Sequence, residues 1–479
     1  MDILQDPAAA AILSVLKQET SEAYVVGGLV RDMLLGRSHD ADIDVALSGN
    51  GFEIARHLAA RTKGAGFVPL DEAEGVGRVV LDRGEGPILD ISSFKGNSIL
   101  EDLARRDFTI NAMAISLRDI LDGRQPAVVD PQCGMSDLRS KSVRACSESA
   151  FVEDPLRVLR AYRFKACLGF NICPETTELL KASIKDLDRV AGERIRDELI
   201  YVLAAETSYD ALVDMTDSGL IEALFPELQP MMGLEQNEYH HLDVWGHTLE
   251  VVRRMEQIVG RLPDFFGEQA GRIQAYLMEE PVRARPRIAL LKLAALFHDA
   301  GKPHTISTGE DGRIHFYRHE IISEEIFSRA AERLKLAVRE IRMVGTWIGG
   351  HMRSMVFTGS SLSNRTLYRL YRDFEEEVVG LIILFLSDLF ASRGPAREER
   401  IEDLALERVR RAVDRFFQAE EEKQPPLLRG GDVIRLFQIA EGPMIGAVLR
   451  RVAELQGSGE ISTLEEAISA AQRFLEEEQ

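Results

Sequence analysis

The sequence predicts an α+β protein, in which an N-terminal domain with a mixed sheet is followed by helical domains up to the C-terminus. Over residues 1–145, short runs of β-branched and aromatic residues alternate with helical patterns, which indicates strands and helices within one domain. Beyond residue 145, apolar residues recur with helical spacing. A chain of 479 residues has room for two to four domains. We therefore expect three helical regions, over residues 146–230, 231–395 and 396–479.

Composition restricts the class of protein. The net charge of −20 argues against a protein that coats nucleic acid, although it leaves room for a local basic face. Met1-Asp2 does not open a signal peptide, and no apolar run is long enough to cross a bilayer. The four cysteines include no Cys-x-x-Cys pair and are typical of reduced thiols. We expect a cytoplasmic protein that does not enter a membrane. The sequence does not indicate its oligomeric state.

The first motif begins with a buried strand over residues 24–26 (Tyr-Val-Val), since aromatic and β-branched residues favour strands. Gly27 and Gly28 then turn the backbone tightly and let a phosphate come close, because glycine accepts positive φ and has no Cβ. A short helix over residues 29–35 follows, and Gly36 ends it. The free N–H groups of the first helical turn provide an anion site.

The next strand carries two carboxylates on one face. Side chains alternate along a strand, so Asp42 and Asp44 share a face while Ile43 and Val45 point into the core. Mg²⁺ prefers oxygen ligands and completes its shell with phosphate oxygens. Two such ions can hold the attacking and leaving oxygens of a phosphoryl transfer. We predict that Asp42 and Asp44 bind Mg²⁺. Taken alone, such a pair is more often a solvated strand edge, but the Gly-Gly turn and Arg31-Asp32 before it favour the metal site.

Together these residues resemble a known family. Gly-Gly-x-Val-Arg-Asp at 27–32, followed by Asp-Ile-Asp at 42–44, is similar to the first motif of class II tRNA nucleotidyltransferases and bacterial poly(A) polymerases, which have a polymerase-β-like head. The resemblance implies that residues 1–145 form a nucleotidyltransferase head. It also implies that Gly27, Gly28 and Arg31 bind the nucleotide.

A second stretch extends the resemblance. Arg-Arg-Asp-Phe-Thr-Ile-Asn-Ala at 105–112 is similar to the family's second motif. Arg105 and Arg106 could hold the triphosphate, because a guanidinium fork matches phosphate oxygens. In this comparison Asp107 and Asn111 read or position the ribose. A solvated, charged helix start is the alternative.

A third stretch resembles the motif with which the family selects its nucleotide, Glu-Asp-x-x-Arg, within residues 151–164. Asp154 and Arg157 are three residues apart, which would place them on one helix face. One offers acceptors and the other donors, so together they could pair with the Watson–Crick edge of a base. An ordinary ion pair is the alternative. The resemblance also places Arg160 and Arg163 among the nucleotide-binding residues.

Further segments resemble the family with one departure. Residues 130–134 are similar to its third motif, except that Cys133 stands where the family usually has glycine, which puts the hinge role of this turn in doubt. Arg194 and Glu198 fall in a helix that buttresses the nucleotide-reading helix in the family. Residues 70–80 lie where the family has a flexible loop linked to nucleotide specificity. Asp90 is either a third metal-binding carboxylate or a satisfied structural one.

A second metal constellation follows in the helical part. Adjacent His298 and Asp299 within an apolar helix form a buried charged pair that needs a partner. Imidazole and carboxylate ligands suit a transition metal or Mg²⁺. The pattern resembles the ligand set of HD-domain phosphohydrolases, which implies four ligands and two residues for a second ion: His247, His298, Asp299 and Asp388, with His319 and His351. A set of structural histidines, or a metal site without turnover, is the alternative.

The resemblance implies template-independent addition of nucleotides from ATP and CTP to the 3′ end of tRNA, either CCA or only A or CC. Poly(A) polymerase is an alternative with the same motifs. A metal phosphohydrolase with a vestigial head is an alternative of another class. A protein-modifying nucleotidyltransferase sensor also joins such a head to an HD domain, but the motifs at 106–109 and 153–157 argue against it.

Overall fold

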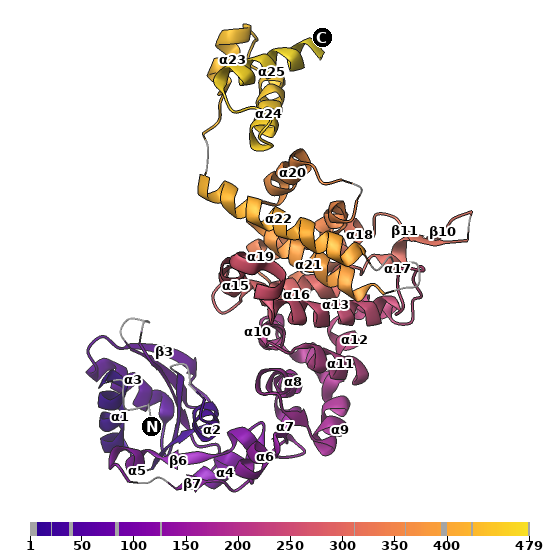
Figure 1. Cartoon of the computed structure of the whole chain (residues 1–479). Coiled ribbons are helices and arrows are strands. Elements are labelled where there is room, and N and C mark those ends of the chain that lie inside the picture. Colours follow the sequence, from indigo (N-terminus) through magenta and orange to yellow (C-terminus); the bar gives the residue numbers. More distant parts are fainter. Residues whose placement is uncertain are drawn as a thin grey trace. The chain divides into compact units, whose positions relative to one another are not determined.

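The computed structural model describes residues 7–20, 22–37, 42–81, 86–124, 127–310, 312–359, 361–393, 400–422 and 425–477. The chain forms two compact units. The first comprises Met1–Glu198 with Asp217–Ala223, and the second comprises Leu199–Thr216 with Leu224–Gln479. Figure 1 shows a sheet-bearing head in the N-terminal part and helices through most of the remainder. The predicted α+β architecture is therefore confirmed.

The head is built on one sheet with seven strands in the described residues, in the order β3-β4-β5-β2-β1-β6-β7. Only β2 and β5 run parallel among these neighbours, so the sheet is mixed. The elements of the head are α1 (Pro7–Glu19), β1 (Ala23–Val26), α2 (Gly28–Leu35), β2 (Asp42–Leu47), α3 (Gly51–Arg61), β3 (Gly66–Asp71), β4 (Val76–Val80), β5 (Ile88–Ser93), α4 (Ile99–Ala104), β6 (Ala114–Ser116), α5 (Leu117–Leu121) and β7 (Val128–Val129).

The central strands confirm the predicted alternation. Ile43 and Val45 of β2 are buried in the core. Asp44 lies opposite Asp90 of the parallel neighbour β5, so the two carboxylates stand on adjacent strands in the same register. The backbone of Asp42 begins β2 and pairs with Ile88. Its side chain lies outside the described residues.

The segment compared above with a flexible loop is a tight hairpin. β3 and β4 occupy most of residues 70–80 and leave only residues 72–75 as a turn. The turn is held from two sides, because Glu74 N donates to Asp71 Oδ1 and Ser93 N donates to the Gly75 carbonyl, at 3.0 and 3.1 Å. Residues 70–80 thus form two strand ends and a short turn, and their comparison with the family's specificity loop stays a prediction.

Helices surround the nucleotide-selecting motif in the rest of the first unit. They are α6 (Gly134–Ser140), α7 (Ala150–Glu153), α8 (Arg157–Leu168), α9 (Pro174–Ser183) and α10 (Gly192–Ala204). A short parallel pair, β8 (Ser142–Val143) and β9 (Asn171–Ile172), joins this region. The helix α8 buries most of one face, including Phe164, and ends at Gly169 in the left-handed region.

The second unit is almost entirely helical. Its main elements are α11 (Tyr209–Asp217), α13 (Val244–Val259), α14 (Leu262–Phe266), α15 (Ala270–Met278), α16 (Arg287–Phe297), α17 (Lys302–Thr305), β10 (Ile306–Thr308), β11 (Ile314–Phe316), α18 (His319–Arg333), α19 (Val338–Gly350), α20 (Asn364–Phe374), α21 (Val378–Ala391) and α22 (Ile401–Glu422). The short helix α12 (Leu220–Leu224) lies mostly in the first unit. Every residue of α16 is buried, so this helix forms the centre of the packing. Among the described residues, none of the helices has both the length and the apolar content needed to span a bilayer.

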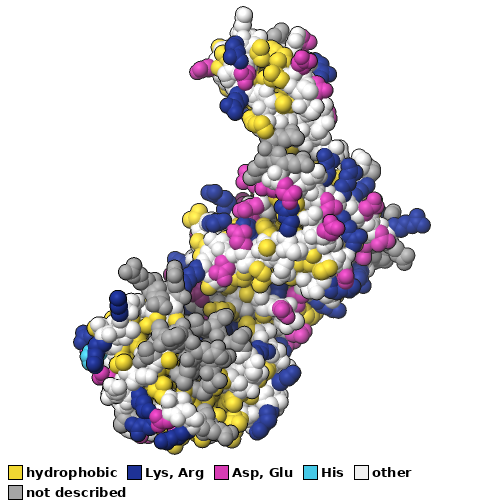
Figure 2. All heavy atoms as spheres, turned by 60° about the vertical axis from the view of Figure 1, so that its left-hand side comes forward, with side chains coloured by type: hydrophobic (Ala, Val, Ile, Leu, Met, Phe, Trp, Pro, Cys, Tyr) yellow, Lys and Arg dark blue, Asp and Glu magenta, His cyan; other side chains and the backbone are white. Residues whose placement is uncertain are grey.

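A small C-terminal lobe follows, made of α23 (Gly430–Phe437), α24 (Pro443–Gly457) and α25 (Leu464–Glu477). It has an apolar core of its own, formed by residues such as Val433, Val448 and Ala467. Figure 2 shows Lys and Arg side chains interspersed with Asp and Glu over the visible face of the molecule. On this face, therefore, neither sign of charge forms a continuous patch.

Candidate active site and metal centre

The glycine turn and β2 meet at the site of the head. Gly27 has a φ of 74°, in the region that favours glycine. A Cβ at Gly27 would lie 3.0 Å from Asp44 Oδ2 and 3.3 Å from Arg106 Nη1. The carboxylate and the guanidinium therefore both face the backbone of the turn, and a side chain at Gly27 would crowd them. An acidic group beside free backbone N–H groups and a cation is an arrangement that can take a metal-bound phosphate.

Asp90 is already satisfied by a neighbour. Arg78 of β4 donates two hydrogen bonds to it, from Nε to Oδ1 at 2.7 Å and from Nη2 to Oδ2 at 2.8 Å. A two-pronged pair of this kind is the preferred geometry of guanidinium and carboxylate. Of the two interpretations of Asp90, the structure therefore favours the structural one.

The second motif forms a bonded network rather than a set of free side chains. Arg31 Nη1 donates to Asn111 Oδ1 at 2.9 Å, and Asn111 Nδ2 donates to Asp107 Oδ1 at 3.2 Å. Asp107 in turn accepts from Arg160 Nη2 at 2.6 Å and from Nε at 2.9 Å. Arg106 pairs with Asp102 at 3.1 Å, and Arg105 caps α4. The network links α2, the turn after α4, and α8.

The charge of Asp107 is stabilised by this network. Burial by itself would raise the pKa of Asp107. The positive charge of Arg160 and the hydrogen bonds from Arg160, Asn111 and the Phe108 N–H outweigh burial and lower the pKa below its usual value. Asp107 is therefore ionised at neutral pH, and it holds Arg160 at a fixed place beside the head.

The structure corrects the geometry expected for Asp154 and Arg157. They do not share a helix face, because Asp154 lies between α7 and α8 in an extended conformation, with φ of −145°. Pro155 explains this, since the residue before a proline is disfavoured in a helical conformation. Arg157 is buried and donates to the carbonyl oxygens of Ala150 and Arg105, at 3.0 and 3.1 Å.

The helix α10 supports the motif as the sequence suggested. Its Arg194 donates to Asp154 Oδ2 at 2.8 Å. Its buried Glu198 accepts from Arg163 at 3.2 Å and contacts Arg160 at 3.5 Å. Two of the arginines implied to bind the nucleotide are thus held by a carboxylate from α10.

The departure at Cys133 has a conformational cost. Cys133 has φ of 59° and ψ of 31°, the left-handed conformation that glycine adopts without penalty. The next residue, Gly134, has no room for a side chain, because a Cβ would lie 2.2 Å from the Thr109 carbonyl oxygen. The turn therefore has a left-handed residue at Cys133 and a position at Gly134 that only glycine can occupy.

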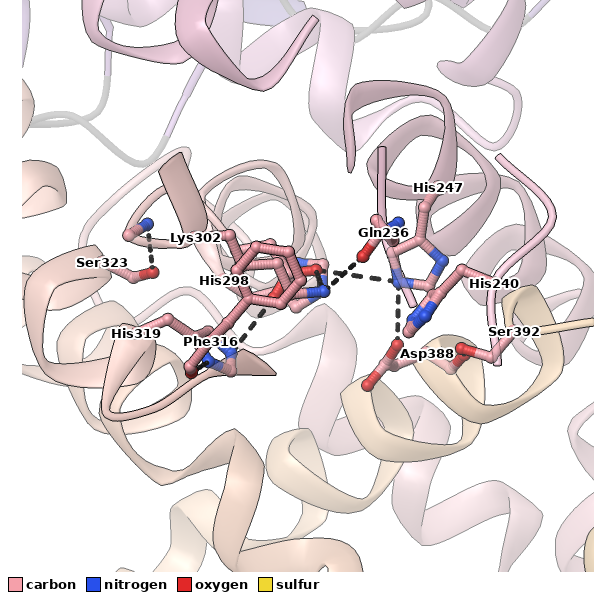
Figure 3. A network of polar contacts seen from close by, with 12 residues as sticks. Gln236, His240, His247, His298, Lys302, Phe316, His319, Ser323, Asp388 and Ser392 are labelled. Atoms are coloured by element: carbon pink, nitrogen blue, oxygen red, sulfur yellow. Dashed lines mark hydrogen bonds and ion pairs between the residues drawn. The ribbon is translucent and has the colours of Figure 1, made fainter. Parts of the chain in front are cut away.

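All six residues of the predicted HD site come together inside the second unit. Figure 3 labels four of them, His247, His298, His319 and Asp388. They form two groups whose ligand atoms lie within 4.8 Å of one another: His247 with His298 and Asp388, and Asp299 with His319 and His351. His247 Nε2 lies 2.9 Å from Asp388 Oδ1, although 141 residues separate them in the chain. His298 Nε2 lies 3.2 Å from Asp299 Oδ2, which joins the two groups.

The imidazoles are oriented for metal binding. The Nδ1 atoms of His298, His319 and His351 each hydrogen-bond to a backbone carbonyl oxygen three residues earlier, at 2.7 Å. This fixes Nδ1 as the donor and leaves Nε2 with a free lone pair. The Nε2 atoms of His319 and His351 face each other at 3.1 Å, and His298 Nε2 is buried without a hydrogen-bond partner. These residues fit one or two divalent cations.

Burial keeps two of these histidines neutral. It lowers the pKa of His351 to about 3, with His298 and His319 adding to the effect, and it lowers the pKa of His247. Burial opposes the charged form of His298 as well, but the negative charge of Asp299 outweighs it and raises the pKa of His298. A neutral imidazole is the form that binds a metal.

Other side chains at this site were not singled out from the sequence. Lys302 Nζ lies 2.6 Å from both Asp299 Oδ2 and Gln236 Oε1, and burial lowers the pKa of His240 to about 3. A cavity of about 400 Å³ opens onto the two ligand groups, and Tyr239 and Tyr317 line it. Lys302 follows Asp299 by three residues, and this spacing, about one turn of chain, was the available signal.

Family models match three consecutive parts of the chain. The poly(A) polymerase head domain matches residues 23–144, and a probable RNA- and SrmB-binding site of polymerase A matches residues 169–232. An HD domain matches residues 244–423. Among known proteins, an A-adding tRNA nucleotidyltransferase of Deinococcus radiodurans is 33% identical over 95% of this chain and 96% of its own length. A CC-adding tRNA nucleotidyltransferase of Geobacter sulfurreducens is 31% identical over 100% of this chain and 97% of its own.

The chain belongs to the tRNA nucleotidyltransferase family. Solved structures of CCA-adding enzymes share the fold. One with CTP has a TM-score of 0.62 and 22% identity, and covers 95% of this chain and 91% of its own. One from Thermotoga maritima in complex with tRNA has a TM-score of 0.62 and 23% identity, with the same coverage. Membership of the tRNA nucleotidyltransferase family identifies the chain as an enzyme and supports a divalent metal in the head.

Proposed function

We propose that this chain adds nucleotides, without a template, to the 3′ end of tRNA from CTP, ATP or both. The observation that carries the proposal is the convergence of Asp44, Arg106 and the Gly27 backbone at one point. It is supported by the similarity over nearly the whole chain to relatives named as A-adding and CC-adding tRNA nucleotidyltransferases. Template-free synthesis requires the protein itself to choose the base, and the helices α7 to α10 provide the side chains for it.

In the proposed reaction, the 3′-hydroxyl oxygen of tRNA attacks the α-phosphorus of the nucleoside triphosphate. The ribose oxygen forms a bond to phosphorus, the bond to the β-phosphate oxygen breaks, and pyrophosphate leaves with the bonding electrons. The hydroxyl proton passes to solvent. Mg²⁺, when bound, supplies positive charge beside the reacting phosphate. Asp44 and Asp42 would hold it with carboxylate oxygens, the ligands that Mg²⁺ prefers.

The arginines have separate tasks in this proposal. Arg106 lies beside Gly27 and Asp44, where it holds a phosphate oxygen of the nucleotide. Asp154 and Arg157 are assigned to the selection of the base. Both are bonded within the protein, to Arg194 and to backbone carbonyls, so they would exchange these partners for the Watson–Crick edge of the base.

Three truncated tRNAs test the proposal. They end before the first C, after one C and after two Cs, and each is incubated with labelled CTP or ATP, with an unrelated RNA as control. We expect extension of at least one tRNA and none of the unrelated RNA. The pattern of extension distinguishes CC, A and CCA addition. Extension of the unrelated RNA by ATP would indicate a poly(A) polymerase instead, and extension of no tRNA would contradict the proposal.

We also propose a second activity, hydrolysis of phosphate esters at the HD site. The two groups of metal-ligating side chains favour it, because they converge inside the unit and meet where His298 Nε2 lies 3.2 Å from Asp299 Oδ2. In such a reaction water adds to phosphorus, the ester P–O bond breaks, and the released alkoxide takes a proton. Divalent cations, when bound, supply a Lewis acid and lower the pKa of water. Lys302, beside Asp299, offers a positive charge for the phosphate.

Metal analysis and a hydrolysis assay test this second activity. Purified protein is loaded with Mg²⁺, Mn²⁺, Co²⁺ or Ni²⁺, and the bound metal is measured by mass spectrometry. We expect bound metal and hydrolysis of a phosphomonoester in the wild type, and loss of both in His298→Ala. Bound metal with no hydrolysis of any ester would show a structural metal centre, and no bound metal would contradict the proposal.

A further inference from the structure

The buried ring of Phe164 is surrounded by three arginines. The guanidinium carbon lies 5.3 Å from the ring centroid for Arg31, 5.8 Å for Arg160 and 5.6 Å for Arg163. A fourth neighbour, Phe108, meets the ring edge-on at 5.5 Å. Phe164 is only 3% exposed, so these contacts are shielded from water. Arg31 comes from α2, whereas Arg160 precedes Phe164 by one turn of α8 and Arg163 is the residue directly before it.

The carboxylates around these arginines do not explain the cluster by themselves. Arg31 pairs with Asp32 at 2.8 Å, Arg160 with Asp107 at 2.6 Å and Arg163 with Glu198 at 3.2 Å. These bonds lie at the edges of the guanidiniums, and Arg31 also donates Nη1 to Asn111 Oδ1 at 2.9 Å. Hydrogen bonds from a planar guanidinium lie in its plane, so they do not contact its flat face. The negative face of an aromatic ring attracts cations within about 6 Å and restrains the guanidinium on a second side.

We propose that Phe164 is a positioning residue for nucleotide binding. Its ring holds Arg31, Arg160 and Arg163 in the orientation that receives the nucleotide, and it connects α8 with α2 behind the glycine turn. The inference rests on the proposed function, since these three arginines are assigned to the nucleotide. A leucine at this position would fill much of the same space and pack on Phe108, but it has no face for a cation.

The test compares two phenylalanines in the same unit. Phe164→Leu removes the ring next to the arginines. Phe52→Leu is the matched control, because Phe52 is 7% exposed and packs edge-on against Phe67 at 5.2 Å, as Phe164 packs against Phe108. Melting temperatures, and the affinities for CTP and for ATP with Mg²⁺ but without tRNA, are measured for both variants and for the wild type.

We expect the two variants to lose similar thermal stability. Only Phe164→Leu should weaken nucleotide binding, by about tenfold relative to the control, because desolvated cation–π contacts are lost. In the tRNA extension assay, KM for the nucleotide should rise more than kcat falls, since the carboxylates of the head are unchanged. Phe164→Tyr keeps the ring and should restore most of the affinity. If Phe164→Leu does not fold, Phe164→Met replaces it, because methionine fills irregular space without a ring.

Two other outcomes would overturn the inference, and they differ in whether the proposed function also fails. Equal nucleotide affinity in Phe164→Leu and Phe52→Leu would show that Phe164 only fills the core, and would overturn the inference while the proposed function stands. A wild type that binds neither CTP nor ATP and extends no tRNA would overturn the proposed function, and the inference with it.

Discussion

The two chemical sites of this chain are built in opposite ways. The site of the head lies at the edge of a glycine turn on a mixed sheet, and its groups are carboxylates and guanidiniums. The HD site lies inside a helical unit, and its groups are buried imidazoles with two carboxylates. Oxygen ligands at a turn suit an ion that arrives with a nucleotide. Imidazoles fixed by backbone carbonyls suit an ion that stays.

The two sites also differ in whether their charged groups are already paired within the protein. In the head, most arginines are already paired with carboxylates, so a triphosphate must compete for them, which favours an exchangeable ligand. In the HD site, hydrogen bonds to backbone carbonyls orient the imidazoles, and burial keeps His351 neutral. The ligand groups are therefore in place before an ion binds. If this contrast is correct, damage to one site should leave the other intact.

The largest effect is expected from Asp44→Asn. Removal of a metal-binding carboxylate should reduce nucleotide incorporation by more than about a hundredfold, since even outer-shell changes at metal sites cost about 10–100-fold. The matched control is Asp90→Asn, because Asp90 holds the same register on β5 but is paired with Arg78. The control should retain most of the incorporation. Equal loss in both variants would make Asp90 a third metal ligand.

Asp107→Asn should destabilise the head by about 3 kcal/mol, because it leaves Arg160 without its buried partner. The pKa of Asp107 is lowered in the folded protein, so its contribution to stability is present above the unfolded pKa of about 3.9 and is lost as the pH falls below that value. Denaturant unfolding at several pH values measures it. The stability difference between wild type and variant should shrink below about pH 4. A constant difference would contradict this account of Asp107.

His298→Ala should lower metal affinity in the HD site by at least about tenfold. Incorporation of nucleotides into tRNA should remain within the range of the wild type, because the head contains none of the HD ligands. His315→Ala is the control, since His315 lines the cavity but belongs to neither ligand group. Metal content and tRNA extension are measured on the same samples. Loss of extension in His298→Ala alone would show that the two sites are coupled.

The smallest effect is expected at Cys133, in the turn over residues 130–134 that was compared with the third motif. Cys133→Gly should stabilise the head by about 1 kcal/mol, because it relieves a left-handed conformation at a residue with a side chain. Thermal unfolding measures this change. The control is Cys133→Ala, which keeps a Cβ in the left-handed conformation and should give no stabilisation. Equal stability of all three proteins would show that the turn carries no strain.

Local patterns predicted the central strand and the position of its acidic pair. The alternation over residues 42–45 is a property of the strand itself, and the structure places Ile43 and Val45 in the core accordingly. The six HD residues were also predicted, but through the resemblance, because no local rule brings His247 and Asp388 together across 141 residues.

The contacts of the nucleotide-selecting motif could not be predicted from spacing. A helix was extended through Asp154, although Pro155 disfavours a helical conformation there. The partners of Arg157 are backbone carbonyls of Ala150 and Arg105, which only the tertiary fold brings close. The contact between Arg31 and the ring of Phe164 could not be predicted either, because it depends on how α2 and α8 pack.

The core of the C-terminal lobe has a consequence for evolution. Residues such as Val433, Val448 and Ala467 pack among themselves, so the lobe carries much of its own folding information. Substitutions within the lobe can therefore be compensated by neighbours within the same lobe.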